Sequence, residues 1–159
     1  NTLTNAGVLA EDRLFATLDP RARRLALPNA GEAVLTDTVG FIRQMPKDLF
    51  AAFRATFEEA ADADLIVEVV DASDPEHDEH LETIDQVLGE LGLLDKPRLR
   101  VFNKVDRLEP ELRASFELKP GSLCVSALDR ESIGPLLDRI ARLARRAASR
   151  RADALAHAG

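Results

Sequence analysis

The residues best suited to chemistry follow the apolar run 99–102, which predicts a short strand: Asn103, Lys104, Val105 and Asp106. The carboxylate of Asp106 can accept two adjacent hydrogen bonds, one on each oxygen. Guanine presents such a donor pair at N1 and N2, whereas adenine presents the opposite polarity and would leave buried groups unpaired. Asn103 would supply an amide near the base N7 and tie neighbouring loops together, and the Lys104 stem would lie along the base. An ordinary strand-ending turn is the alternative.

A second polar string ends the expected strand 33–36. It consists of Asp37, Thr38, Val39 and Gly40 and has the form D-x-x-G. The carboxylate of Asp37 can reach a magnesium ion through water. Gly40 has no Cβ, so its amide can approach a γ-phosphate. Taken alone, this string is weak evidence, and a plain turn explains it better.

A third string, Ser126, Ala127 and Leu128, follows the expected strand 123–125. A backbone N–H at this position can meet the O6 atom of guanine. All three strings lie at the C-terminal ends of expected strands, where α/β sheets bind their ligands. Their order and placement together predict one guanine-nucleotide site.

Strands and helices take turns along the chain. The expected strands are 23–28, 33–36, 65–70, 99–102 and 123–125, and the expected helices are 48–61, 75–92, 109–116 and 130–156, after a helix tail at 1–8. The nearly continuous apolar run 65–70 predicts a strand buried on both faces. The alternation predicts an α/β fold with a mostly parallel sheet and helices on both faces.

Composition narrows the class of protein. The 159 residues suit one domain, and the net charge of −7 argues against sequence-specific DNA binding or a surface built for nucleic acid throughout. The single cysteine, Cys124, excludes an internal disulfide and is expected to be a buried small hydrophobe. No apolar stretch approaches the ~20 residues that span a bilayer. The start lacks a signal peptide and an initiator Met, so we expect a soluble, cytoplasmic protein cut from a longer chain.

Longer segments resemble one family. Residues 37–46, continuing through Glu59, resemble the switch II region and following helix of HflX GTPases, which belong to the Obg-HflX group of translation-factor-related P-loop GTPases. Residues 15–20 are similar to their switch I, and residues 69–75 to the segment after their fourth strand. The likeness covers nearly the whole chain.

The resemblance implies a three-layer P-loop NTPase (G-domain) fold over residues 1–141, with 142–159 continuing the C-terminal helix as an Ala/Arg-rich tail. It also implies GTP hydrolysis, with GTP or GDP and Mg²⁺ as ligands and the large ribosomal subunit as partner. Thr17 would coordinate Mg²⁺ in the GTP state, and Asp37 would reach it through water. The nucleotide would be lined by Phe15, Ala16, Thr17, Leu18, Asp19, Asp37, Thr38, Val39, Gly40, Asn103, Lys104, Val105, Asp106, Ser126, Ala127 and Leu128.

The sequence departs from the family pattern in its phosphate-binding parts. No G-x-x-x-x-G-K-[ST] string occurs, so we expect a chain that begins after the P-loop and lacks the first, central strand. Arg21 follows Leu-Asp-Pro where the family usually has threonine. We expect these 159 residues alone to bind GTP weakly, because most of the affinity comes from the P-loop.

Phe41 bears on mechanism. Many GTPases place a glutamine directly after D-x-x-G to orient the attacking water, and a phenylalanine cannot do this. Another residue, a bound K⁺ ion or the ribosome would then position the water, or Phe41 merely packs beneath switch II. Two rivals to a hydrolysing enzyme therefore stay open: a nucleotide-sensing binding module and a non-catalytic remnant.

Two clusters of charge have ordinary explanations as well as functional ones. His77 and His80 could suggest a metal, but an acid-rich, solvated helix start is the expected account. Six arginines in the last helix could contact ribosomal RNA or simply form a solvated face. These are Arg139, Arg142, Arg145, Arg146, Arg150 and Arg151.

Overall fold

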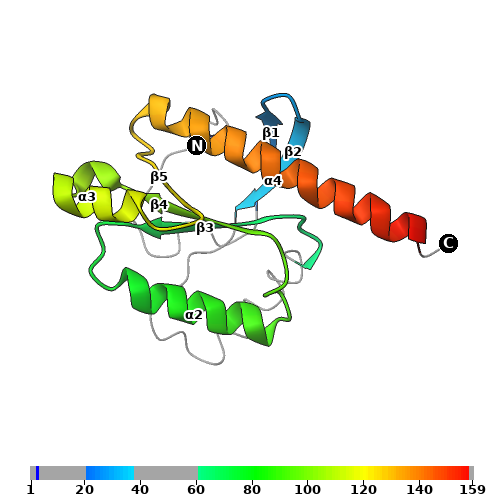
Figure 1. Ribbon diagram of the computed structural model, residues 1–159, viewed down its shortest axis with the longest axis horizontal. Coiled ribbons are helices and arrows are strands. Elements are labelled where there is room, and N and C mark those ends of the chain that lie inside the picture. Colours follow the sequence, from blue (N-terminus) through cyan, green and yellow to red (C-terminus); the bar gives the residue numbers. More distant parts are fainter. Residues whose placement is uncertain (1–2, 4–20, 38–60, 158–159) are drawn as a thin grey trace.

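The computed structural model describes Leu3 and residues 21–37 and 61–157 (Figure 1). The strands in these ranges are β1 (Arg21–Leu27), β2 (Gly31–Asp37), β3 (Ile66–Asp71), β4 (Arg98–Asn103) and β5 (Ser122–Cys124). The helices are α2 (His77–Glu90), the short 3-10 turn η1 (Val105–Arg107), α3 (Pro110–Glu117) and α4 (Arg130–His157). Every strand and helix expected within these ranges is confirmed, with bounds shifted by a few residues.

β1 and β2 form an antiparallel hairpin in which Arg21 pairs with Asp37 and Leu27 with Gly31. Its turn needs left-handed backbone, with φ of 53° at Asn29 and 75° at Gly31, which these residue types adopt readily. The alternation of the strand puts Leu25 and Leu27 on one buried face. The expected hairpin is therefore confirmed.

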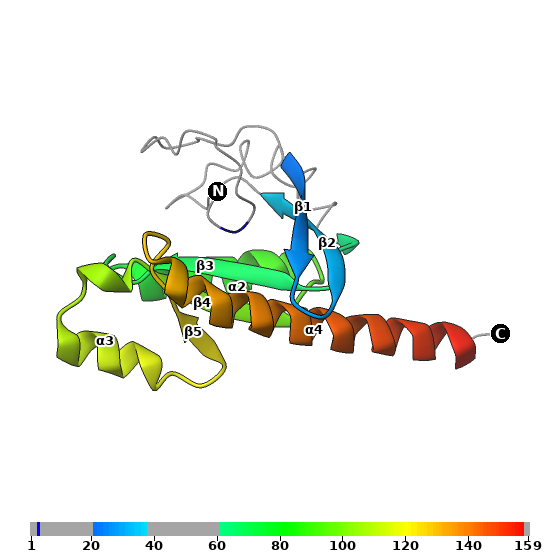
Figure 2. The same cartoon turned by 90° about the horizontal axis from the view of Figure 1, so that it is seen from above.

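β3, β4 and β5 form a parallel sheet in that order. Figures 1 and 2 show α4 running along one face of this sheet, with α2 on the other. β4 lies in the centre, and its alternation sends Leu99 and Val101 toward α4 and Phe102 toward α2 and α3. Each of these three side chains is 1% exposed, so β4 is buried on both faces at the centre of the core.

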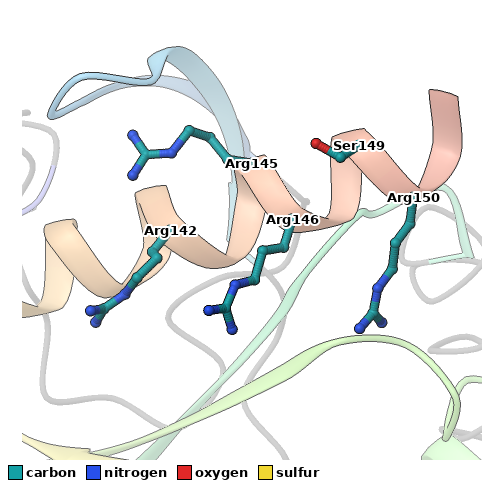
Figure 3. Close-up of a pocket in the computed structure, with 5 residues that line it drawn as sticks. All are labelled: Arg142, Arg145, Arg146, Ser149 and Arg150. Atoms are coloured by element: carbon teal, nitrogen blue, oxygen red, sulfur yellow. The ribbon is translucent and has the colours of Figure 1, made fainter. Parts of the chain in front are cut away.

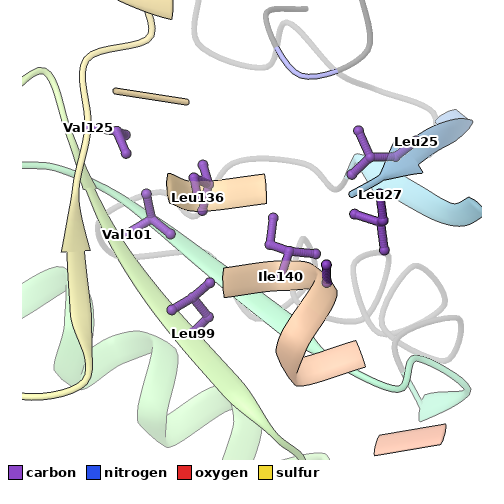
Figure 4. Close-up of a cluster of buried hydrophobic side chains, with 8 residues drawn as sticks. Leu25, Leu27, Leu99, Val101, Val125, Leu136 and Ile140 are labelled. Carbon is purple, nitrogen blue, oxygen red and sulfur yellow. The ribbon is translucent and has the colours of Figure 1, made fainter. Parts of the chain in front are cut away.

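The larger core cluster joins the sheet, α4 and the hairpin (Figure 4). Leu136 and Ile140 of α4 lie one helical turn apart and pack between β4 and β1, as their spacing predicts. The buried members of the cluster are Leu25, Leu27, Leu99, Val101, Val125, Leu136, Ile140 and Ala141. α4 thus attaches the hairpin to the parallel sheet. Among the described helices, none is long and apolar enough to cross a membrane.

The prediction that the strand at 65–70 is buried on both faces is wrong at one position. Val69 is 64% exposed, because no described residue covers this end of the strand's face. Val67, two residues earlier on the same face, does pack against the α4 cluster. The opposite face is buried at Glu68 and Val70, which are 5% and 6% exposed.

Candidate functional site

The carboxyl ends of β3, β4 and β5 bring together the segments in which polar residues follow each strand. In the parallel register, Asp71 is the partner of Asn103, and Phe102 is the partner of Cys124. The backbone continues this pairing past the strands: the Ala72 N–H donates to the Asn103 carbonyl at 2.8 Å, and the Val125 N–H donates to the Phe102 carbonyl at 2.8 Å. These segments therefore lie side by side at one edge of the sheet.

Asn103 connects two of the predicted nucleotide-binding strings. Its side-chain Oδ1 accepts a hydrogen bond from the Ala127 N–H at 3.0 Å, across 24 positions of sequence. A second link runs from the Val105 N–H to the Val125 carbonyl at 3.4 Å. The strings 103–106 and 126–128 are thus held as one unit, as the expected tie by Asn103 requires.

Lys104 adopts the left-handed backbone conformation, with φ of 64°. Its Nζ lies 2.6 Å from Oδ2 of Asp71, at the end of the neighbouring strand. The other carboxylate oxygen of Asp71 accepts hydrogen bonds from the Ser73 N–H at 3.0 Å and from the Ser73 hydroxyl at 2.6 Å. Lys104 is therefore held by a carboxylate that is itself held in place.

The charge state of Asp71 follows from these contacts. Partial burial acts to raise the pKa of its carboxyl, but the hydrogen bonds from Lys104 and Ser73 outweigh burial and hold the pKa below its usual value. Sequence reasoning assigned no role to Asp71. The available signal was an aspartate that directly ends the strand next to the lysine's own strand.

Asp106 lies in η1, and its side chain is exposed. The residue before it, Val105, is 3% exposed and packs in a cluster with Phe102 and Phe116. Because the buried side chain of Val105 fixes the turn to the core, Asp106 lies exposed at the surface, close in sequence to Lys104. This is the position from which it could accept hydrogen bonds from a base.

Ser126 fixes the third string to the start of α4. It is 5% exposed, and its N–H donates to Oγ of Ser132 at 3.0 Å, while that hydroxyl lies 2.8 Å from the Ser126 carbonyl. The Oγ of Ser126 accepts from the Leu128 N–H at 3.3 Å. Ala127 and Leu128 are left exposed beside Asn103. A base bound at this corner would therefore contact the backbone of these two residues.

Most residues predicted to contact the phosphates and the metal lie outside the part of the chain that the structure describes. Residues 15–19, 38–40 and Phe41 lie outside the described residues, and Asp37 marks the end of β2. Within the described ranges, no group of three or more His, Cys, Asp or Glu side chains could hold a metal. The predicted roles of these residues remain predictions.

Two other residues have ordinary surroundings. The His77 ring lies 5.2 Å from the ring of Phe116 and is only 16% exposed, so the expectation of a solvated helix start is wrong at this residue. His77 caps the aromatic cluster of the core instead of facing water. Partial burial raises the pKa of the Cys124 thiol, which leaves it less reactive than a free cysteine.

Comparison with known proteins agrees with this geometry. The protein family described as 50S ribosome-binding GTPase matches residues 1–104. The chain is 50% identical over 148 residues to GTPase HflX of Magnetococcus marinus, covering 92% of this chain and 34% of the relative. It is 46% identical over 130 residues to GTPase HflX of Escherichia coli, covering 80% of this chain and 30% of the relative. The chain thus spans about a third of the length of these curated relatives.

Solved structures show the same fold. A GTP-binding protein from the archaeon Sulfolobus solfataricus in complex with GDP superimposes with a TM-score of 0.63 at 31% identity, over 80% of this chain and 45% of that one. The complex of SsGBP with GDP gives a TM-score of 0.67 at 31% identity, over 80% of this chain and 43% of that one. The predicted α/β G-domain fold is confirmed. The chain belongs to the 50S ribosome-binding GTPase family, as part of a G domain of the HflX type.

Proposed function

We propose that these residues form the guanine-reading part of a GTP-binding, GTP-hydrolysing protein of the HflX type. One observation carries the proposal: the hydrogen bond from the Ala127 N–H to Asn103 Oδ1, which joins the N-K-x-D string to the loop after β5. Strings that are far apart in sequence are thereby held in one place with Asp106 exposed beside them. Such preorganisation is what selective binding of a flat, polar base requires.

Recognition of the base follows from the donors and acceptors at this corner. Asp106 accepts from N1 and N2 of guanine, and the loop at 126–128 offers backbone N–H groups toward O6. Lys104, held by Asp71 at 2.6 Å, extends its aliphatic stem along the base. Adenine would turn a hydrogen-bond acceptor toward the Asp106 carboxylate. A carboxylate that a base covers without donating to it lowers the affinity for that base by roughly several-fold to a thousand-fold.

The phosphates and the metal belong to the other side of the site. Thr17 and Asp37 are the proposed Mg²⁺ contacts, the latter through water, and Mg²⁺ would neutralise charge on the phosphates when bound. Phe15, Ala16, Leu18, Asp19, Thr38, Val39 and Gly40 would line the same nucleotide. Phe41 cannot orient water, so the proposed hydrolysis depends on another group to do so. The family's description as ribosome-binding supports the large ribosomal subunit as partner, in the cytoplasm.

The test uses the P-loop-completed protein, which we define as these 159 residues joined at Asn1 to the first strand and P-loop of a curated HflX relative. Asp106→Asn should weaken GTP binding by about 100-fold, because the variant replaces an acceptor of two hydrogen bonds by an amide. The same variant should prefer XTP, because xanthine carries an oxygen acceptor where guanine carries its amino group. Fluorescent-nucleotide titration measures both.

Asp95→Asn is the matched control, because Asp95 is an exposed aspartate in the loop between α2 and β4 and makes the same change of charge. It should leave GTP and XTP affinities as in the wild type. An Asp106→Asn variant that keeps wild-type GTP affinity and shows no gain for XTP would sink the proposed base recognition. Single-turnover hydrolysis is then measured with and without large ribosomal subunits. A sensing module, the alternative that Phe41 favours, would hydrolyse GTP only with the subunits present, whereas the proposed enzyme hydrolyses it in both cases.

A further inference from the structure

One face of α4 carries a row of arginines, which we call the arginine face: Arg142, Arg146 and Arg150. Together with Arg145 and Ser149 they line an open groove on the helix surface. Figure 3 shows the three side chains of the arginine face extending to the same side, whereas Arg145 extends in another direction. Positions four residues apart on a helix are about 6 Å apart along its axis, so the charges form a line.

The arginine face has no acidic partner among the described residues, and all three of its members are exposed. Arg145 is different, because its Nη1 donates to the carbonyl of Asn29 at 2.9 Å and so helps to dock the hairpin. No Asp or Glu occurs between positions 139 and 151, which hold six arginines. Since the whole chain has a net charge of −7, the remainder carries −13, and the positive charge is concentrated here.

Ordinary helix electrostatics do not explain this row. Cations are favoured near a helix C-terminus, but the effect falls off within the last turn. α4 ends at His157, so Arg150 lies about two turns before the end, and Arg142 about four. Like charges four residues apart also repel each other and destabilise a helix. A row of repelling, unpaired arginines fits a surface that receives negative charge from outside.

The residue types favour phosphate groups carried on a nucleic acid over a lipid surface. The guanidinium group binds phosphate with two parallel hydrogen bonds, and all six cations of the 139–151 stretch are arginine, although the chain also contains lysines. A membrane-surface helix needs large apolar side chains beside its charges. Outside residues 151, 154 and 155, whose side chains the structure does not describe, α4 has no exposed large apolar side chain. The exposed large apolar side chains lie in other elements: Val34, Val69, Leu94, Leu112, Leu118 and Leu128.

We propose that the arginine face of α4 binds the phosphate backbone of RNA. The choice of RNA as the polyanion rests on the proposed function, since a ribosomal partner presents RNA. The groove is open to solvent and lined by residues of one helix, so it suits a backbone laid along the helix and not a small anion held in a closed pocket. Binding is independent of sequence, because phosphates carry none.

The test measures binding of the P-loop-completed protein to a fluorescein-labelled RNA duplex of mixed sequence over a range of salt concentrations. The variant R142Q/R146Q/R150Q should bind at least tenfold more weakly. The slope of log affinity against log salt should fall by between about two and three, at ~0.9 for each lost phosphate contact. R142K/R146K/R150K keeps the charge and should bind with an intermediate affinity and nearly the wild-type slope.

The matched control is R24Q/R113Q/R130Q, which removes three positive charges from other exposed positions. It should keep the wild-type slope. An unchanged slope in R142Q/R146Q/R150Q, or an equal loss in the control, would overturn the proposal. Binding of the wild type to vesicles of phosphatidylserine and phosphatidylcholine but not to RNA would overturn it too.

Folding and the proposed function are checked separately. If R142Q/R146Q/R150Q does not fold by circular dichroism, the single variants R146Q and R150Q replace it, and each should lower the slope by about one. Titration with fluorescent GDP on the same preparations reports on the guanine site alone. Lost RNA binding with intact GDP binding supports the arginine face, whereas RNA binding that persists in a wild type without GDP affinity contradicts only the proposed function.

Discussion

Two carboxylates on the same strand, β3, allow a comparison between a buried ion pair and an ion pair at the proposed base-binding site. Glu68 lies in the middle of the strand and Asp71 at its carboxyl end. They are three residues apart, and because side chains alternate along a strand they lie on opposite faces. In the parallel register Glu68 is opposite Arg100, and Asp71 is opposite Asn103. Both carboxylates are paired with cations from the next strand or the residue after it. Their surroundings are otherwise unlike.

Glu68 is fully enclosed. Its side chain is 3% exposed, and its two oxygens accept from Arg98 Nη1 at 3.0 Å and from Arg100 Nε at 2.9 Å. Arg98 also donates to Asp85 of α2, and this bond is the main reason why the pKa of Arg98 is raised. Glu68 therefore joins β3 to β4 directly, and Arg98 extends the link to Asp85 of α2.

Asp71 is about a third exposed and holds a single lysine at the edge where strands end. Its pairing orients a cation toward the place where the base is proposed to bind. The buried carboxylate, with a cation at each oxygen, has a structural role, whereas the partly exposed carboxylate at the end of the strand remains accessible to a ligand. Substitutions at these two positions should therefore affect different measurements.

The largest effect is expected for Glu68→Ala, which removes the buried carboxylate between Arg98 and Arg100 and leaves them only the half-exposed Asp85 as a shared partner. We expect the free energy of unfolding of the P-loop-completed protein to fall by about 2–3 kcal/mol, below the usual 3–5 for a buried pair because the arginines are partly exposed and can reach water. Urea unfolding measures it. GDP affinity of the folded fraction should stay within twofold of wild type.

Glu90→Ala is the control, since Glu90 is an exposed acid at the end of α2 that accepts a single bond from Gln86. It should change the unfolding free energy by less than about 0.5 kcal/mol. Glu68→Gln, which keeps the shape and one acceptor oxygen, should fall between the two. Equal stability of Glu68→Ala and Glu90→Ala would show that the buried pair holds nothing together.

Asp71→Asn should have the opposite profile. The amide oxygen can still accept from Ser73, so the turn is kept, but the charge that holds Lys104 is removed. We expect GDP to bind about five- to tenfold more weakly, or ~1 kcal/mol, because the lysine stem must then be ordered by the ligand itself. Asp95→Asn makes the same change at an exposed position in the loop between α2 and β4 and should bind GDP normally.

Much of this difference was not visible in the sequence. The apolar run that contains Glu68 predicted the strand correctly, but its acidic residue gave no sign of burial. Its partners Arg98 and Arg100 lie thirty or more positions away, and only the register of two strands brings them opposite. Local periodicity reports the existence of a strand, and pairing across a parallel sheet depends on the tertiary fold.

The candidate site was easier to predict from the sequence than the pairing of Glu68, for a physical reason. The chemistry of base recognition demands particular residue types at strand ends, so Asn103 could be expected to tie loops, and the structure contains its bond to Ala127. Asp71 was missed because a lone aspartate after a strand has many uses. Val69 was misjudged because the same β-branched types occur on covered and uncovered ends of a strand.

The smallest expected effect is the pH dependence of stability that comes from Asp71. The pKa of Asp71 lies below its ordinary value of 3.8, so the folded protein prefers the charged form. This contribution to stability is fully present above the ordinary value and is lost as pH falls through the lowered pKa. The unfolding free energy of wild type should therefore exceed that of Asp71→Asn at pH 7, and the gap should close as the pH falls below the ordinary value of 3.8.

The gap itself should be less than about 1 kcal/mol, because a pair that is about a third exposed is screened by water, and 0.5 M NaCl should narrow it further. Urea unfolding of both proteins at pH 7, 4 and 3 measures the closing of the gap. Asp95→Asn, at an exposed position in the loop between α2 and β4, provides the comparison for general acid effects. A gap that stays constant down to pH 3, or that grows as the pH falls, would mean that the Lys104 pair does not favour the ionised carboxylate, and the contrast with Glu68 would then lie in burial alone.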